Sequence, residues 1–160
     1  SYTSIMEDKS FEPRNFHFRN DGESFKFRSV ITGHGQQGEF IARIHTLNID
    51  GGDIDYEWRL WKECADNAIF PQGGTWIYDR AGWCPGAPSD VYEFDITDKV
   101  GPGETHELDY GLVYASGTSN YIVNNQLVTY GEINHAIDAR LAKILNMVGG
   151  FNPVRLTASD

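Results

Sequence analysis

The sequence predicts an all-β fold, an antiparallel jelly-roll β-sandwich in a single domain with an irregular N-terminal leader. Seven or eight short segments of the 160-residue chain alternate apolar with polar side chains, as strands with one buried face do. Turn signals separate these segments at short intervals, and 17 glycines are scattered among them. Hydrophobic residues make up 40% of the chain, which is enough for a core at this length.

The predicted elements follow in order along the chain. Residues 1–23 are polar and rich in turn signals, so they form a leader, a linker from an upstream segment, or an edge segment, and the jelly roll covers residues 24–160. The expected strands are 25–31, 40–49, 56–60, 92–96, 106–114 and 121–130, the last holding one strand or two. Asp50-Gly51-Gly52 predicts a hairpin turn. Residues 136–148 fit a helical stripe by their pattern, and a strand stays open as the alternative only because the family resemblance given below favours it.

Charge and hydropathy narrow the classes of partner. The formal net charge of −10 argues against nucleic acid and against anionic membranes, whereas a neutral ligand such as a glycan is compatible with it. No stretch approaches the roughly 18 consecutive apolar residues of a membrane span, so no membrane insertion is predicted.

The two cysteines, Cys64 and Cys84, are too few for a zinc site of the paired-cysteine type. Their even number and turn-rich surroundings favour one disulfide and an oxidising compartment, so the protein is expected to be secreted or at the cell surface. In the chain-entropy model, closing a loop of this size stabilises a fold by about 3 kcal/mol. Two unpaired buried thiols are the alternative.

Neither a metal nor a cofactor is predicted. No HxH or HxxxH pair occurs among the five histidines, which are His17, His34, His45, His106 and His135. The aspartates of the segment 50–55 lack the rest of an EF-hand frame, and a hairpin turn explains them.

Residues 64–88 form a long loop in which glycine and proline recur. The loop contains the run Asp79-Arg80-Ala81-Gly82-Trp83-Cys84-Pro85-Gly86. Its guanidinium can donate two hydrogen bonds to paired oxygens, and its indole offers a flat apolar face. The run therefore indicates a rigid platform for a polar ligand.

The run closely resembles one in the C-terminal half of the peptide-N-glycosidase F family, whose members cut N-linked glycans from asparagine. Two weaker similarities extend the resemblance over residues 27–153. The segment 28–35 is similar to the family's strand into a glycine turn. Glu39-Phe40, followed by Arg43, His45 and Thr46, is similar to its Ala-Glu-Trp segment. The resemblance implies an N-glycan or a glycoprotein as the partner.

The same resemblance assigns roles to individual residues. It implies that Glu39 positions a water or a sugar hydroxyl and that Arg80 positions the substrate for catalysis. It places Trp83 against the sugar, with His34 and Asp79 as further substrate-binding residues. Simpler interpretations stay open: a local ion pair of Asp79 with Arg80, packing of Trp83 on the disulfide, and a solvated Glu39.

The sequence also departs from the family pattern. Gln37 and Ile41 stand where the family brackets its glutamate with half-cystines, and His34 stands where it has tryptophan. The principal catalytic aspartate of the family lies in an N-terminal jelly roll, which the predicted leader cannot supply. The prediction is therefore an N-linked glycan amidase-like domain that is incomplete for catalysis alone and needs an upstream jelly-roll domain or a partner subunit. The alternative is a non-catalytic carbohydrate-binding or assembly module.

Overall fold

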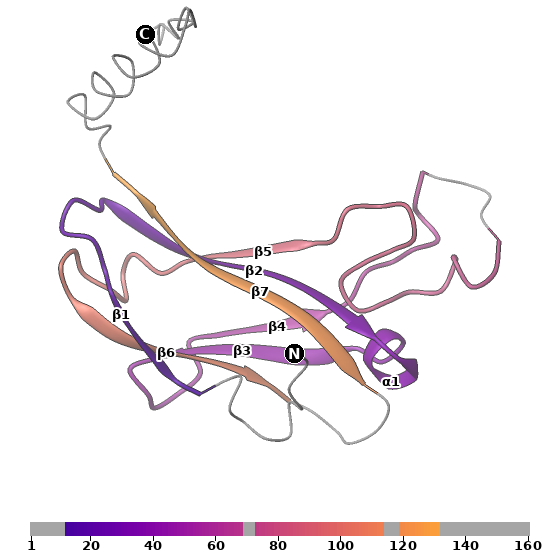
Figure 1. Ribbon diagram of the computed structural model, residues 1–160, viewed down its shortest axis with the longest axis horizontal. Coiled ribbons are helices and arrows are strands. Elements are labelled where there is room, and N and C mark those ends of the chain that lie inside the picture. The colour runs from indigo at the N-terminus through magenta and orange to yellow at the C-terminus, as the bar shows by residue number, and fades with distance from the viewer. Residues whose placement is uncertain (1–11, 69–72, 114–118, 132–160) are drawn as a thin grey trace, which may run out of the picture. The chain divides into compact units, whose positions relative to one another are not determined.

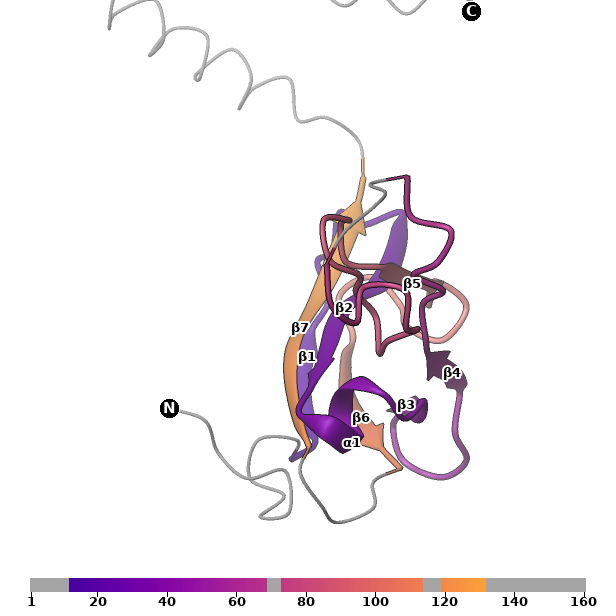
Figure 2. The ribbon, with the colours of Figure 1, turned by 90° about the vertical axis from the view of Figure 1, so that its right-hand side faces the viewer.

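A computed structural model of the chain describes residues 12–68, 73–113 and 119–131, and its fold is that of the compact unit Ser1–Tyr130. Seven strands of these residues form two antiparallel sheets that lie face to face (Figures 1 and 2). The elements are β1 (Arg14–His17), β2 (Ser24–His34), α1 (Gln36–Glu39), β3 (Arg43–Ile49), β4 (Tyr56–Leu60), β5 (Val91–Asp95), β6 (Thr105–Leu112) and β7 (Asn120–Tyr130). The predicted all-β jelly-roll sandwich is confirmed.

The strand order explains the term jelly roll. One sheet has the order β1-β6-β3-β4 and the other the order β5-β2-β7, and every neighbouring pair is antiparallel. Within the described residues, only β3 and β4 are neighbours both in the sequence and in a sheet. The other connections cross from one sheet to the other, as they do in jelly rolls.

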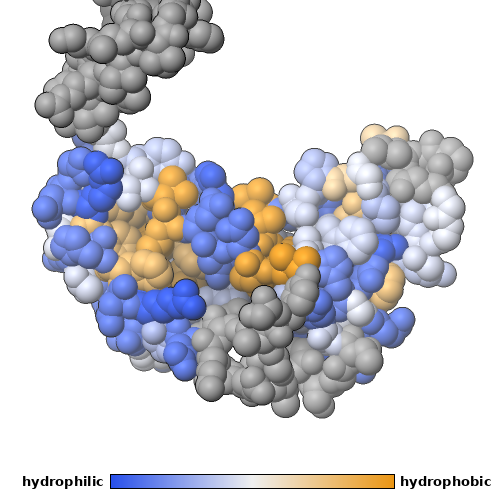
Figure 3. Space-filling view, viewed as in Figure 1, coloured by the Kyte–Doolittle hydropathy of each residue, from blue (hydrophilic) through white to orange (hydrophobic). Residues whose placement is uncertain are grey.

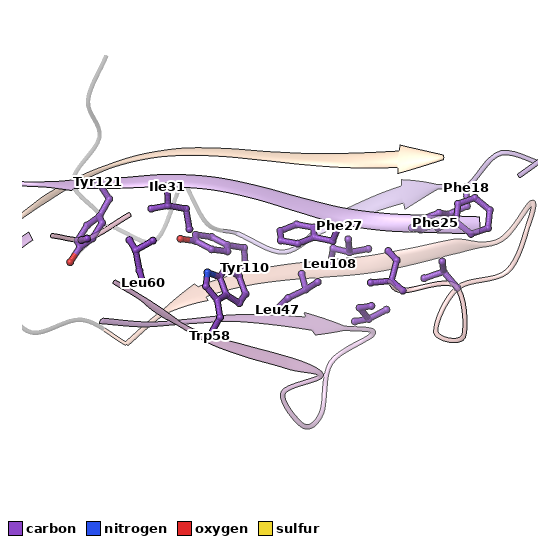
Figure 4. Close-up of a cluster of buried hydrophobic side chains, with 14 residues drawn as sticks. Phe18, Phe25, Phe27, Ile31, Leu47, Trp58, Leu60, Leu108, Tyr110 and Tyr121 are labelled. Atoms are coloured by element: carbon purple, nitrogen blue, oxygen red, sulfur yellow. The ribbon is translucent and has the colours of Figure 1, made fainter. Parts of the chain in front are cut away.

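The core lies between the two sheets, where inward side chains of β2 meet those of the other layer (Figure 4). Buried and partly buried positions alternate strictly along β2, as its sequence predicts for a strand with one face in a core. Phe25, Phe27 and Ile31 point from β2 toward the opposite sheet. The other buried hydrophobic residues of the core cluster are Phe18, Leu47, Ile49, Trp58, Leu60, Ala81, Ile96, Val100, Leu108, Tyr110 and Tyr121.

One titratable side chain, His45, is fully buried in this core. Its Nδ1 lies 2.6 Å from the hydroxyl oxygen of Tyr110, and its ring stacks on Trp58 with 5.8 Å between centroids. Tyr121 of the other sheet meets the same ring edge-on at 5.7 Å. Burial lowers the pKa of His45 to about 4, so the ring is neutral at neutral pH.

The strand predicted over residues 40–49 begins three residues late, at Arg43. Residues 40–42 belong to no helix or strand, and α1 ends before them at Glu39. Gly35 precedes α1 with a φ of 75°, which ends the extended path of β2. Gly38 of α1 then lies against the backbone of Asn120, because a Cβ on Gly38 would be 3.0 Å from the Asn120 nitrogen. This long-range contact leaves no signal in the local alternation, so the sequence did not predict the helix.

The N-terminal stretch holds one regular element. Arg14–His17 form β1, which pairs with β6 at the edge of its sheet, so the interpretation as an edge segment is correct for these residues. All four side chains of β1 are exposed, which explains why apolar alternation did not reveal the strand. The boundary between a leader at 1–23 and a jelly roll at 24–160 stays a prediction.

In Figures 1 and 3, β7 and β1 lie nearest the viewer, and hydrophobic residues show between polar ones along this edge of the sandwich. β7 is one strand, and its inward residues Val123 and Leu127 are only partly buried. The inward Asn125 accepts a hydrogen bond from the buried Ser29 Oγ, at 2.6 Å.

Tyr114 and residues 136–148 lie outside the described residues. None of the described helices is long and apolar enough to span a membrane.

The predicted disulfide between Cys64 and Cys84 is present, with 5.4 Å between the two Cα atoms. The disulfide closes a loop of residues 64–84, the disulfide loop. Asn67 Nδ2 in this loop donates to Pro85 O at 2.7 Å, and Lys62 Nζ before it donates to Pro88 O after it at 3.0 Å. The disulfide loop is therefore tied at several points.

Removing the disulfide should destabilise the fold. Replacing Cys64 and Cys84 by alanine is expected to lower the free energy of unfolding by about 3 kcal/mol, because the unfolded chain regains the entropy of an open loop. Urea denaturation of the variant and of the oxidised wild type measures this difference. A loss below about 1 kcal/mol would contradict the prediction.

The neutral state of His45 predicts sensitivity to acid. The unfolded chain takes up a proton at the ordinary pKa of 6.5, whereas the folded chain does so only near 4. The unfolded state therefore binds more protons in this window, and the free energy of unfolding should fall by about 3 kcal/mol as the pH is lowered across it.

Urea denaturation of wild type and His45→Gln, repeated between about pH 4 and about pH 7, tests this expectation. The variant should show a flatter dependence on pH, and parallel curves would refute the assignment. His106 changes stability in a different pH range. Its pKa is raised, mainly by the hydrogen bond to Asp50, so the stability that protonated His106 contributes is present below pH 6.5 and is lost only as the pH rises above that value.

Candidate functional site

The candidate site lies where β2 ends beside α1, and four of the predicted residues meet there. His34 is the last residue of β2, Glu39 is the last residue of α1, and Arg80 and Trp83 come from the disulfide loop. Figure 1 shows α1 and this loop at the same end of the sandwich.

Backbone hydrogen bonds fix the loop against β2 and α1. Gly33 N donates to Ala81 O at 2.9 Å, and Ala81 N donates to Glu39 O at 2.9 Å. Arg80 exchanges two backbone hydrogen bonds with Lys62, at 2.8 and 3.0 Å. Segments that are far apart in the sequence thus hold one another in place at the site.

Two glycines allow these segments to approach so closely. Gly82 has a φ of 76°, and a Cβ on it would lie 2.1 Å from Ile31 O. A Cβ on Gly33 would lie 2.0 Å from Gly38 O. Neither position has room for a side chain. This explains why glycine occurs at Gly82 in the loop motif and at Gly33 near the end of β2.

Arg80 is the central side chain of the site and is only 4% exposed. Its Nη1 forms an ion pair with Glu39 Oε1, and its Nη2 donates to Thr75 O at 2.5 Å and lies 3.1 Å from Thr75 Oγ1. Such partners are required, because an uncompensated charge in a protein interior is strongly destabilising. The Glu39 side chain is 18% exposed, so part of its carboxylate faces solvent.

The ion pair is not the local one that the sequence left open. Among the described residues, Arg80 pairs with Glu39, which is 41 positions away, rather than with the adjacent Asp79. Asp79 Oδ1 instead accepts a hydrogen bond from Cys64 N, at 3.2 Å. Asp79 therefore ties the loop to the disulfide, and its role in substrate binding stays a prediction.

Trp83 stands beside this ion pair in a fixed orientation. Its Nε1 donates to Gly33 O at 2.9 Å, and its ring centroid lies 4.9 Å from Arg80 Cζ, a cation–π contact. The His34 ring lies 5.5 Å from it at 32°, and His34 Nε2 is 2.8 Å from Thr32 Oγ1. The sequence-predicted residues His34, Arg80 and Trp83 thus share one continuous set of contacts.

Sequence reasoning missed three contributors to the site, Thr75, Phe40 and Tyr78. The Phe40 ring lies 5.1 Å from Arg80 Cζ, and the Tyr78 ring meets Phe40 edge-on at 6.4 Å. Tyr78 is exposed. The position of Phe40 directly after Glu39 was the one signal available, because it falls in the segment similar to Ala-Glu-Trp.

The arrangement favours a neutral, polar ligand with an apolar face. Glu39 can accept a hydrogen bond from a hydroxyl or a water, and Trp83 offers a flat surface beside it. Within the described residues, no group of three or more His, Cys, Asp or Glu side chains is placed to hold a metal ion. The functional groups that the described residues bring together here are a carboxylate, a guanidinium and an indole.

Comparisons with known proteins agree with this fold. The sequence model of the family described as "Peptide-N-glycosidase F, C terminal" matches residues 1–132, whereas no curated protein matches the chain. A crystal structure of peptide-N(4)-(N-acetyl-β-D-glucosaminyl) asparagine amidase is 24% identical, with a TM-score of 0.67 over 73% of this chain. Recombinant peptide:N-glycanase F is 22% identical, with a TM-score of 0.68 over 82%. PNGF-II is 17% identical, with a TM-score of 0.64 over 83%.

The chain spans less than half the length of these structures, namely 43%, 45% and 27% of their respective chains. Identities this low show a shared fold and nothing more. The family match is stronger, because it covers 132 of the 160 residues and includes every residue of the candidate site. On that match, the chain belongs to the peptide-N-glycosidase F family and represents its C-terminal jelly-roll domain.

Proposed function

We propose that this chain forms the glycan-facing wall of an N-linked glycan amidase and is incomplete for catalysis alone. One observation carries the proposal. A carboxylate that is partly open to solvent, Glu39, is fixed by the buried Arg80 next to the indole of Trp83. This set suits a sugar attached to an amide, since it combines an acceptor for hydroxyl groups with a stacking surface.

The proposed reaction is hydrolysis of the amide bond between the innermost sugar and the asparagine side chain. The oxygen of a water bonds to the side-chain carbonyl carbon, the carbon–nitrogen bond breaks, and the nitrogen leaves with a proton. The products are aspartate in the polypeptide and a glycosylamine. Glu39 would position the water or a sugar hydroxyl, Arg80 would keep Glu39 in place, and Trp83 and His34 would bind the sugar.

A second carboxylate from outside the described residues completes this scheme. The Glu39 oxygen that pairs with Arg80 is already occupied, so Glu39 is better suited to positioning than to accepting a proton. The amidase structures extend well beyond the part that this chain matches, which supports an upstream jelly-roll domain or a partner subunit as the source. The disulfide supports a secreted or cell-surface location.

The second candidate is a non-catalytic carbohydrate-binding module. The observation in its favour is the same ion pair, because mutual neutralisation of Glu39 and Arg80 leaves a site that is suited to binding. The two candidates share the glycan ligand and differ in whether the amide is cleaved.

Binding of a glycopeptide with one N-linked chitobiose tests the shared part. Trp83→Ala is expected to weaken binding about tenfold, because stacking on the sugar is lost. Glu39→Gln is expected to weaken binding as much and also to lower the free energy of unfolding by about 3 kcal/mol, because Arg80 loses its partner. Titration calorimetry and urea denaturation measure the two effects.

Glu57→Gln, an exposed change on β4, is the matched control and should alter neither quantity. Incubation of a denatured N-glycoprotein with the chain in heavy-oxygen water separates the candidates. Heavy oxygen at former glycosylated asparagines, absent with Glu39→Gln, would show that this chain is sufficient and that the missing carboxylate is not needed. Failure of both glycan binding and conversion would refute the proposed function.

A further inference from the structure

We infer that an apolar patch beside the site, formed by Phe40, Ile41, Ile77 and Tyr78, binds apolar side chains of the polypeptide that carries the glycan. The inference rests on the proposed function, because it assigns a binding surface to the polypeptide part of the same glycosylated substrate. It would make the sequence around the glycosylated asparagine a determinant of specificity.

The first argument is the continuity between this patch and the site. Ring and cation contacts connect His34 to Trp83 at 5.5 Å, Trp83 to Arg80 at 4.9 Å, Arg80 to Phe40 at 5.1 Å, and Phe40 to Tyr78 at 6.4 Å. Arg80 lies in the middle of this row, together with its partner Glu39. The partner of Glu39 thus contacts two rings, Trp83, which leads on to His34, and Phe40, which leads on to Tyr78.

The second argument is that the two ends differ in chemistry. At one end, Trp83 and His34 both hold polar partners, Gly33 O and Thr32 Oγ1. At the other end, Ile41, Ile77 and Tyr78 are 42%, 46% and 56% exposed. Ile41 directly follows Phe40 and Ile77 directly precedes Tyr78, so the Phe40–Tyr78 contact holds these two segments together. Three exposed apolar side chains thus lie on the two segments that this contact joins beside the site, and exposed apolar surface next to a site is a mark of binding surfaces.

The third argument matches each end to a part of the substrate. A sugar ring needs a flat aromatic face and polar neighbours, which the Trp83 end provides. Branched aliphatic side chains such as Ile41 and Ile77 are not flat, but they suit the leucine or phenylalanine side chains of an extended peptide. An extended residue spans roughly 3.4 Å, and Phe40 directly follows Glu39, so a residue flanking the asparagine is close to Phe40 when the linkage is held at Glu39.

Titration calorimetry with two pentapeptides tests the inference. Both peptides carry N,N′-diacetylchitobiose on a central asparagine, and they have either leucine and phenylalanine or serine and glycine as flanking residues. We expect the apolar peptide to bind wild type about tenfold more tightly. In the double variant Ile41→Ser/Ile77→Ser the ratio should fall to about one, while the Kd of free diacetylchitobiose stays the same.

Ile54→Ser is the matched control, because Ile54 is exposed by 56% but lies between β3 and β4. It should preserve the preference for the apolar peptide. Equal binding of the two peptides by wild type, or a preference that survives in the double variant, would overturn the inference and leave the proposed function standing. Absence of binding by free diacetylchitobiose and by both peptides would overturn the proposed function, and this inference with it.

Discussion

The buried charge of Arg80 is the constraint on which one end of this sandwich depends. A guanidinium that is almost fully enclosed requires a carboxylate and further acceptors, since removing one partner of a buried pair leaves an uncompensated charge. Glu39 and Thr75 meet that requirement from α1 and from the disulfide loop. The same requirement brings together two segments, α1 and the disulfide loop, that are far apart in the sequence. Whatever binds at this end meets a carboxylate and an indole whose positions are already fixed before binding.

The rest of the fold supports this arrangement by holding the backbone close. Gly33 and Gly82 permit approaches that a Cβ would prevent, and the disulfide limits the freedom of the loop that carries Arg80. The two sheets contribute a rigid base, because β2 runs from the centre of the core directly into the site. A binding site on a loop is thereby fixed to a rigid scaffold, and such preorganisation reduces the entropy lost when a ligand binds.

Under the proposed function, the side chains around Arg80 would contact both parts of the substrate. Arg80 contacts two rings, Trp83 and Phe40, which lead toward a polar end and an apolar end. An N-glycosylated polypeptide has the same division, with a hydroxyl-rich sugar on one side of the amide and a peptide on the other. The fold class does not require this correspondence, since jelly rolls carry many unrelated sites.

The sequence by itself determined the strands with one buried face, because alternation with a period of two is a local property that each segment carries in full. The sequence also predicted the loop and its disulfide. Glu39, Arg80 and Trp83 were identified as site residues by their resemblance to a family and not by their spacing in the sequence. The tertiary structure decided which carboxylate pairs with Arg80, and it chose Glu39 over the adjacent Asp79. It also decided that a short helix, α1, precedes a strand that begins later than predicted, and that exposed residues form β1. These outcomes depend on close backbone contacts and strand pairing between segments that are distant in the sequence, and the local sequence pattern does not encode such contacts.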